Sequence, residues 1–338
     1  MIRDILSSMR CLALIFGIVA VSNLFASHGE VPRHFIVEGN WVYYRLAHTP
    51  ERCLSKVWAT APRVTNPSPC SNNVGKCVLT TDSIQRRFNH ESGLSVALMF
   101  LPNLDWTIEA RATGLLKWSA SKSATCPGAL RLPIDPNYTY DYKYADHASA
   151  RYRSSFDTIE LNLFGHITPR RKNYFSGSYI IGARFVEIDE RIRLRYVNEG
   201  RTSKYWAKTW NHMFGPQLGL DLSTFPNHWF SWGLNFKLGL LGNFAKQESI
   251  MRDLHNSIVL RDFDHKAFNL SWMGEIAPFF LFRPTRWSYI RFSYQVFWLS
   301  DIAAAPCQLG LKSYGGNVVD NNADRVYYGG YIGLGVEF

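Results

Sequence analysis

Two groups of side chains in this sequence carry the residue types that general acid–base chemistry requires. One is Asp262, Asp264 and His265 in the segment RDFDHK, and the other pairs Asp157 with His147. Such chemistry needs a positioned base beside a nucleophile or an activated water. The sequence places no partner acid with either group, so a solvated loop or strand end is the simpler interpretation. We therefore expect that the protein is not an enzyme.

Metal and cofactor chemistry is not indicated either. The histidines are scattered, with no spacing of two ligands that would suit a metal: His28, His34, His48, His90, His166, His212, His228 and His255. The sequence has no Gly-rich phosphate loop and no Gly-x-Ser-x-Gly turn. We expect no metal, no cofactor and no nucleic-acid partner.

Five cysteines follow the apolar N-terminal run that holds Cys11. They are Cys53, Cys70, Cys77, Cys126 and Cys307, and their spacing fits no tetrahedral zinc site. An odd number leaves at least one thiol after disulfides form. We expect disulfides that tie loops together, with one thiol available for a cross-link to another protein.

The elements that carry these residues are strands, because hydrophobic and polar residues alternate with period two. Ten segments show the alternation: 34–46, 91–100, 106–118, 152–164, 176–190, 206–222, 229–243, 265–281, 287–300 and 325–338. In one of them, Phe230, Trp232, Leu234, Phe236, Leu238 and Leu240 alternate with Ser231, Gly233, Asn235, Lys237 and Gly239. The fifth segment is less regular, since Glu187 and Asp189 fall on its hydrophobic parity. A bulge or an early strand end would explain them.

The lengths of these strands and of their connections indicate a membrane barrel. Soluble strands average five or six residues, whereas a tilted strand that crosses a bilayer needs about 9–11. Short turns near 102–105, 167–173, 224–227 and 283–286 alternate with long segments at 47–90, 119–151, 191–205, 244–264 and 301–324. Short periplasmic turns and long external loops are typical of outer-membrane barrels. We predict an all-β, closed antiparallel transmembrane barrel of about ten strands, within a range of 8–12, in a bacterial outer membrane.

The chain ends with RVYYGGYIGLGVEF, whose hydrophobic parity continues to the last residue, Phe338. A sheet in hydrocarbon must close, so this strand should pair with the first one. A terminal aromatic resembles the C-terminal signal that the outer-membrane insertion machinery recognises. That resemblance implies that Phe338 is the terminal signal residue, with Tyr331 and Tyr327 as lesser candidates.

The opposite parity of the strands carries charges of both signs. These predicted lumen-facing residues are Glu38, Glu109, Arg111, Lys117, Glu160, Arg184, Lys237, Glu275, Arg291 and Glu337. Charges buried in a soluble protein are expensive unless they are paired, but the lumen of a membrane barrel is polar. Where a path exists, such charges set ion selectivity.

The N-terminus has the layout of a secretory signal. Arg3 and Arg10 precede and flank the apolar run 11–21, and Ala26 offers a cleavage point. We predict a cleaved signal over 1–26 and a single barrel domain over 27–338. The chain of 338 residues has a net charge of +10. That excess indicates anion preference, contact with anionic lipopolysaccharide, or simply solvated loops.

Three patches resemble known outer-membrane proteins. FIVEGNWVYYR (35–45) and SGLSVALMFLPNLDW (92–106) resemble the pore-forming group of the chlamydial major outer membrane protein. SYIIGARFVEIDERI (178–192) also resembles a strand of planctomycete outer-membrane barrels. The resemblance implies a porin-like role and carries over no catalytic residue.

These observations favour a porin-like channel for ions or small solutes, with a structural role in the Gram-negative envelope. Ten strands lie between small filled barrels and wide porins, so a barrel without an open path is equally compatible. The alternatives are a protease or lipase at the external rim, or an adhesin that uses Tyr138, Tyr140, Tyr142 and Tyr144. The expected partners are outer-membrane lipid and lipopolysaccharide, the insertion machinery and a disulfide-linked envelope protein.

Overall fold

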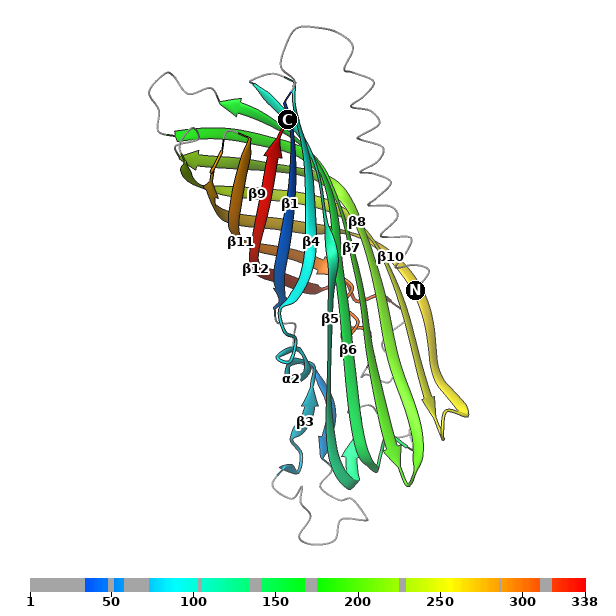
Figure 1. Cartoon of the computed structure of the whole chain (residues 1–338). Helices are drawn as coiled ribbons and strands as arrows, with labels where there is room; N and C mark the ends of the chain where they lie inside the picture. The colour runs from blue at the N-terminus through cyan, green and yellow to red at the C-terminus, as the bar shows by residue number, and fades with distance from the viewer. Residues whose placement is uncertain are drawn as a thin grey trace.

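Ten antiparallel strands form a closed ring in this protein. A computed structural model describes residues 34–47, 52–57, 73–102, 105–133, 141–167, 175–224, 229–285, 287–310 and 318–338. The ring consists of β1 (His34–Leu46), β4 (Glu91–Leu101), β5 (Trp106–Arg131), β6 (Ala145–Ile167), β7 (Phe175–Asn198), β8 (Arg201–Thr224), β9 (Phe230–Asp253), β10 (Ile258–Phe282), β11 (Ser288–Ile302) and β12 (Ala323–Glu337). The predicted barrel of ten strands is confirmed (Figure 1).

The first and last strands close the ring. β1 and β12 are paired from Ile36↔Glu337 to Leu46↔Tyr327. Directly after the end of β12, Phe338 exchanges two backbone hydrogen bonds of 3.1 and 2.8 Å with Phe35 of β1. We call this end of the barrel, where β1 begins and β12 ends, the terminal end.

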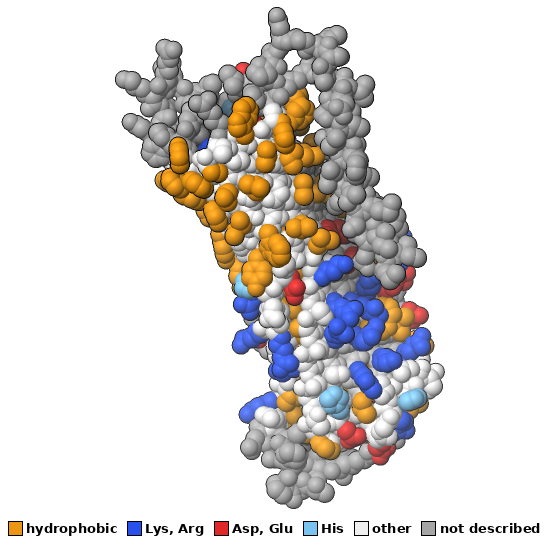
Figure 2. Space-filling view, viewed as in Figure 1, with side chains coloured by type: hydrophobic (Ala, Val, Ile, Leu, Met, Phe, Trp, Pro, Cys, Tyr) orange, Lys and Arg blue, Asp and Glu red, His pale blue; other side chains and the backbone are white. Residues whose placement is uncertain are grey.

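Outward-facing hydrophobic side chains on all ten strands form a belt around the barrel next to the terminal end, and Figure 2 shows one face of this belt. This apolar belt includes Trp41, Leu94, Ile108, Leu161, Ile181, Phe214, Leu218, Leu220, Trp232, Leu238, Phe268, Leu270, Trp272, Ile276, Phe280, Phe292, Ile332 and Leu334, all of them exposed. So many exposed large hydrophobic side chains in one contiguous band mark a lipid contact rather than a water-exposed surface.

Six strands continue well beyond the apolar belt, and this corrects the predicted loops. β5–β10 are 23–26 residues long, whereas β1, β4, β11 and β12 have 11–15. The segments predicted as loops at 191–205 and 244–264 are therefore mostly strand, as are both ends of 119–151. We call the part of β5–β10 beyond the belt the extension; in Figure 1 it forms the lower, trough-shaped half of the molecule.

β7 is a continuous strand and has neither the predicted bulge nor the predicted early end. Its pairing with β6 and β8 has no register shift from Ile167↔Gly177 to Asn198↔Arg201. Glu187 and Asp189 face outward, as the alternation requires, but they lie past the apolar belt. The charges are accommodated because the strand leaves the belt after Phe185.

Lys117 faces outward, so its prediction as a lumen charge is wrong. The pairing of β5 with β6 shifts between Thr113 and Leu116, and Leu115 adopts a φ of 69°. This extra residue reverses the parity, because a bulge places two residues opposite one. Leu116 is consequently buried and Lys117 is exposed.

The concave side of the extension is filled by two connections. The segment between β1 and β4, predicted as a loop at 47–90, contains β2 (Cys53–Val57), β3 (Cys77–Thr80) and the short helix α2 (Thr81–Gln85). A capping box between Thr80 and Ser83 begins the helix. Residues 303–310, directly after β11, pack beside them. Together they bury one hydrophobic core that includes Leu54, Leu79, Ile84, Phe88, Trp118, Tyr152, Ile192, Tyr196, Tyr205, Ile302 and Leu309.

The predicted signal at 1–26 lies outside the described residues. Among the residues that the structure describes, no helix is long and apolar enough to cross a membrane.

Candidate functional site in the barrel interior

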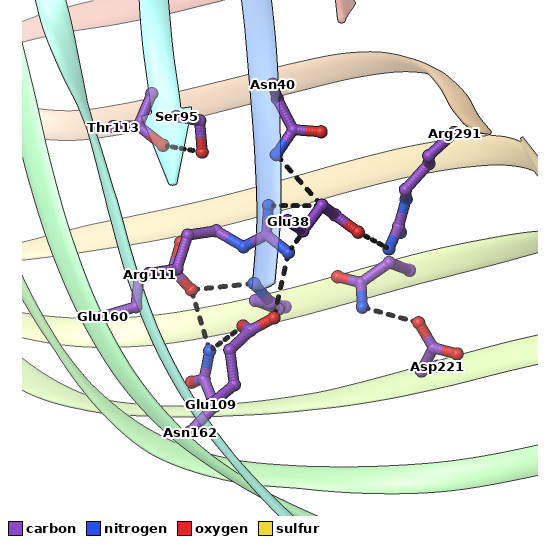
Figure 3. A network of polar contacts seen from close by, with 12 residues as sticks. Glu38, Asn40, Ser95, Glu109, Arg111, Thr113, Glu160, Asn162, Asp221 and Arg291 are labelled. Atoms are coloured by element: carbon purple, nitrogen blue, oxygen red, sulfur yellow. Dashed lines mark hydrogen bonds and ion pairs between the residues drawn. The ribbon is translucent and has the colours of Figure 1, made fainter. Parts of the chain in front are cut away.

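An ionic cluster around Glu38 lies inside the barrel near the terminal end. Arg111 Nη1 is 3.2 Å from Glu38 Oε1, and Arg111 Nη2 is 2.9 Å from Glu109 Oε2. The Tyr289 hydroxyl donates to Glu38 Oε2 over 2.6 Å, while Arg291 Nη1 is 3.9 Å from the same oxygen. The Glu38 carboxylate is completely buried, so these donors replace its lost water (Figure 3).

A second ionic cluster lies next to the first, farther from the terminal end. Glu160 Oε2 is 2.6 Å from Arg184 Nη2 and 2.7 Å from Lys237 Nζ. Glu275 shares both cations, at 2.6 Å from Arg184 and 3.6 Å from Lys237. These four side chains come from β6, β7, β9 and β10, so the cluster joins facing parts of the wall across the lumen.

Two amides connect the clusters. Asn162 Nδ2 donates to Glu109 Oε1 over 3.0 Å and to Glu160 Oε2 over 3.1 Å. Gln217 Nε2 donates to Glu160 Oε2 over 3.1 Å. The two clusters therefore form one continuous polar network, part of which Figure 3 shows.

An aromatic layer follows the second cluster. Phe156 packs against Tyr327 in a tilted geometry and against Phe297 edge to face, with ring centroids 4.5 and 5.2 Å apart, and Trp118 lies 5.4 Å from Tyr327. The Arg184 guanidinium is 5.2 Å from the Phe297 ring centroid, which joins this layer to the ionic cluster. These rings are buried and fill the interior where the belt gives way to the extension.

A third ionic contact lies beyond the aromatic layer. Arg325 Nε and Nη2 are 2.7 and 2.8 Å from the two carboxylate oxygens of Glu190. The Tyr152 hydroxyl is 3.0 Å from Arg325 Nη2, and the Ala305 amide donates to Glu190 over 3.0 Å. The pair therefore anchors the segment after β11 to the inner wall of the extension.

A cavity of about 300 Å³ occupies the interior at the terminal end. Its lining runs from Leu101, Thr107, His166, Ser223 and Arg283 near the strand ends to Glu160, Arg184, Phe297 and Tyr331. Both ionic clusters border this cavity, and the aromatic layer lies at its far end. The arrangement can accommodate a small polar solute or ions from the terminal end.

Eight of the ten predicted lumen charges take part in these ionic clusters. They are Glu38, Glu109, Arg111, Glu160, Arg184, Lys237, Glu275 and Arg291. Lys117 faces outward, as described above. Glu337 is half-buried at the terminal end, where its amide donates to the Trp287 carbonyl over 2.8 Å.

Sequence reasoning missed the most buried pair, Arg325–Glu190, and the two connecting amides. Glu190 was the last residue of the predicted fifth strand, and Arg325 the first of the last strand. The alternation assigns both to the inward parity, but only the folded chain shows that they meet.

The candidate catalytic residues are not assembled into a site. Asp262 and Asp264 face outward on β10, whereas His265 faces the other side. Asp157 and His147 are ten residues apart on β6, about 33 Å along an extended strand. In the described ranges, no group of three or more His, Cys, Asp or Glu side chains could hold a metal ion.

The disulfide whose two cysteines are both described lies within one predicted loop rather than between two loops. Cys53 and Cys77 form a disulfide within the segment between β1 and β4, joining β2 to β3. Cys126 is disulfide-bonded and lies on β5 rather than in a loop, and Cys70 is outside the described residues. Cys307 is free and half-buried, and burial raises the pKa of its thiol.

The residues singled out for insertion and adhesion lie in different surroundings. Phe338 is 67% exposed, whereas Tyr327 and Tyr331 are buried in the interior. Tyr142 is also buried, with its hydroxyl donating to the Arg252 carbonyl over 2.7 Å, so it is not an exposed recognition residue. Tyr138 and Tyr140 lie outside the described residues, and Tyr144 is half-buried.

Comparisons with known proteins give structural neighbours only. No family model and no curated protein matches the chain. The structure is similar to the outer-membrane protease OmpT from Escherichia coli (14% identity, TM-score 0.40, covering 93% of this chain and 99% of that one). It is also similar to the translocator domain of the autotransporter NalP from Neisseria meningitidis (8%, 0.37, 98% and 98%) and to the toluene transporter TbuX of Ralstonia pickettii (10%, 0.22, 92% and 90%).

The fold itself is clear from the chain's own geometry. Ten antiparallel strands close on themselves, charged side chains are paired inside, and hydrophobic side chains cover the outside next to the terminal end. A sheet can remain in hydrocarbon only when it closes and leaves no unpaired edge. The chain is a ten-stranded transmembrane β-barrel of the outer-membrane type.

Proposed function

We propose that this protein is a structural barrel of the bacterial outer membrane that is closed to solutes in its resting state. Its terminal end faces the periplasm, and its extension stands outside the cell. The apolar belt supports this placement: on β8 it spans about nine residues, from Phe214 to Leu222, which is the length a tilted strand needs to cross hydrocarbon.

The observation that carries the proposal is the order of layers along the interior. The cluster of Glu160, Arg184, Lys237 and Glu275 is followed directly by the aromatic layer, and all these side chains are buried. Moving a solute past them would separate buried ion pairs, which costs about 3–5 kcal/mol when one partner is lost. A core of buried hydrophobic side chains then fills the extension.

Planar-bilayer recordings of the refolded protein test the proposal. We expect no conductance steps from the wild-type chain at moderate voltage. Arg184→Ala combined with Phe297→Ala should open a path and produce steps, whereas the exposed variant Lys117→Ala should behave like wild type. Regular steps from wild type would contradict a closed resting state.

A narrow channel for ions or small solutes is the second candidate. The cavity of about 300 Å³ favours it, because charges of both signs line a space that begins at the terminal end. In this case the aromatic layer would act as a gate, and wild type would conduct only after that layer moves. Membership of the chlamydial pore-forming group belongs to this candidate and stays a prediction.

Heat-modifiable migration of the refolded chain tests the barrel separately. A closed barrel should migrate faster before boiling than after it. This readout does not depend on conductance, so a closed lumen and a failure to form the barrel can be told apart.

A further inference from the structure

Basic side chains gather on the outer face of the extension, close to the apolar belt. On β6, β7 and β8, outward positions are occupied by Arg151, Arg153, Arg191, Arg193 and Lys208. We call these five residues the basic belt. Figure 2 shows Lys and Arg side chains in a band directly beyond the hydrophobic side chains.

The strand register places like charges directly opposite one another in the basic belt. Arg153 is paired with Arg191, which is paired in turn with Lys208, and Arg151 is paired with Arg193. Directly paired residues have Cβ atoms about 4.5–5.5 Å apart, and like charges at that distance are destabilising. Three neighbouring strands therefore hold a positive surface that needs anions to offset its repulsion.

The central arginines have no carboxylate within ion-pair distance among the described residues. Arg153, Arg191 and Arg193 form no ion pair with any described residue, and Arg191 instead packs over Trp206 with 5.3 Å to the ring centroid. The neighbouring face of β9 and β10 differs, since Lys246 is 2.9 Å from Glu248 and 3.1 Å from Asp264. The unbalanced charge is thus a local property of the arginines on β6 and β7, because Lys208 on β8 is paired in register with Glu248 on β9.

The height of the basic belt matches a headgroup layer. On β7 the last apolar outward side chain is Phe185, Glu187 and Asp189 come next, and Arg191 lies six residues beyond Phe185. Six residues of a strand span about 20 Å along its axis, and less along the membrane normal because barrel strands are tilted. Arg191 and Arg193 therefore stand above the hydrocarbon, at the level of a thick, phosphorylated headgroup.

We infer that the basic belt binds the phosphate groups of lipopolysaccharide in the outer leaflet. The inference rests on the proposed outer-membrane placement, and it identifies the lipid class that this face contacts. Arginine forks suit phosphate oxygens, and the indole rings of Trp206 and Trp210 suit the interface next to them. Lys208 Nζ lies 3.7 Å from the Trp210 ring centroid, which holds its charge on the same outer face.

Titration of the detergent-refolded full chain with purified lipopolysaccharide tests this inference. The variant Arg153→Ser/Arg191→Ser/Arg193→Ser should bind at least about tenfold more weakly than wild type, because each basic residue at an anionic surface contributes about 1 kcal/mol. Lipopolysaccharide stripped of its phosphates should bind wild type as weakly as the intact lipid binds the variant. Inorganic phosphate at the same phosphate concentration should not compete.

A matched control removes three charges elsewhere on the outside. Lys56, Arg252 and Lys266 are exposed on β2, β9 and β10, and their triple change to Ser should leave the affinity within about twofold of wild type. Equal lipopolysaccharide affinity of the basic-belt variant and wild type would overturn the inference, as would equal loss in the control or competition by inorganic phosphate. Heat-modifiable migration of each sample shows that the barrel has formed, so a lost lipid site is distinguished from a failed fold.

Discussion

Arg325 and Glu190 are 135 residues apart in sequence and form a two-pronged ion pair in the barrel interior, with both side chains completely buried. The contact joins the start of β12 to β7 across the core. We predict that Glu190→Gln destabilises the barrel by about 3–5 kcal/mol, because it leaves the Arg325 charge buried without its partner. Urea unfolding in lipid vesicles measures the change.

A double variant and a surface pair provide the comparison. Glu190→Leu with Arg325→Met should be less destabilising than Glu190→Gln, since apolar replacements remove both buried charges. Lys246→Ala breaks a solvent-accessible pair and should be far less destabilising than Glu190→Gln, because water screens the charges. Similar losses of folding stability for all three variants would show that the buried pair contributes no more than a surface pair.

Substitution of Leu218 tests whether the apolar belt contacts lipid. It faces outward on β8 with 62% of its surface exposed, between Ile181 and Leu238 in the register. Leu218→Arg should reduce folding stability in vesicles by about 2–4 kcal/mol, because a charge then faces hydrocarbon. The control Ser123→Arg introduces the same side chain at an exposed position on the extension. It should change folding stability by less than about 0.5 kcal/mol. An equally stable Leu218→Arg barrel would show that the belt does not contact lipid.

The Cys53–Cys77 disulfide closes a segment with a sequence separation of 24 residues. Replacing both cysteines with Ser should destabilise the packing of β2, β3 and α2 against the extension by about 3 kcal/mol. The barrel itself should persist, because its ten strands do not depend on this link. Limited trypsin digestion should cut the variant faster near Lys76 and Arg86, while heat-modifiable migration is retained. Unchanged digestion would contradict a stabilising role.

Among the cysteines that the structure describes, Cys307 should be the one that maleimide labels in the folded protein. Burial raises the pKa of this thiol, so less reactive thiolate is present at a given pH than for an ordinary cysteine. Labelling should therefore be slow near neutral pH, and its rate should keep rising above pH 9.0, the ordinary value. Mass spectrometry of tryptic peptides locates the label. A rate that levels off below that pH would contradict the raised pKa, and Cys307→Ser should remove the label from the tryptic peptide that contains residue 307.

The membrane-embedded half of the fold could be predicted from sequence because its pattern has one physical cause. Lipid requires hydrophobic residues at every second position outside, as at Phe214, Leu218 and Leu220 on β8. The residues of the opposite, polar parity must then face the lumen, and this predicts that Glu160, Arg184 and Lys237 are lumen-facing. The contacts among them could not be predicted, since strand tilt and stagger decide which inward residues meet.

The extension was predicted as loops because its hydrophobic parity is reversed. On β7, Ile181 and Phe185 face outward within the belt, whereas Ile188, Ile192 and Leu194 are buried inside the extension. The strand is continuous, but its surroundings change from lipid to water outside and from a polar lumen to an apolar core inside. The strand predicted over 176–190 ended soon after charged residues reached the outer face, so it was shorter than β7 by about a third.

The wrong prediction that Lys117 faces the lumen has a different cause. Nothing in the segment TGLLK (113–117) reveals that Leu115 is an inserted residue, because hydrophobic residues occupy both parities there. The displaced residue is visible only in the pairing with β6.

The reversal of surroundings along β5–β10 has a consequence for how the sheet finds its alignment. A slip of one position between β7 and β8 would turn Arg191 toward the apolar core and Ile192 toward water, while in the membrane it would turn Arg184 toward lipid. The same register error is therefore unfavourable twice, once where the strands face lipid and once where they face water and the apolar core. Strands that extend beyond the bilayer thus specify the correct register more strongly than the membrane-spanning part would alone.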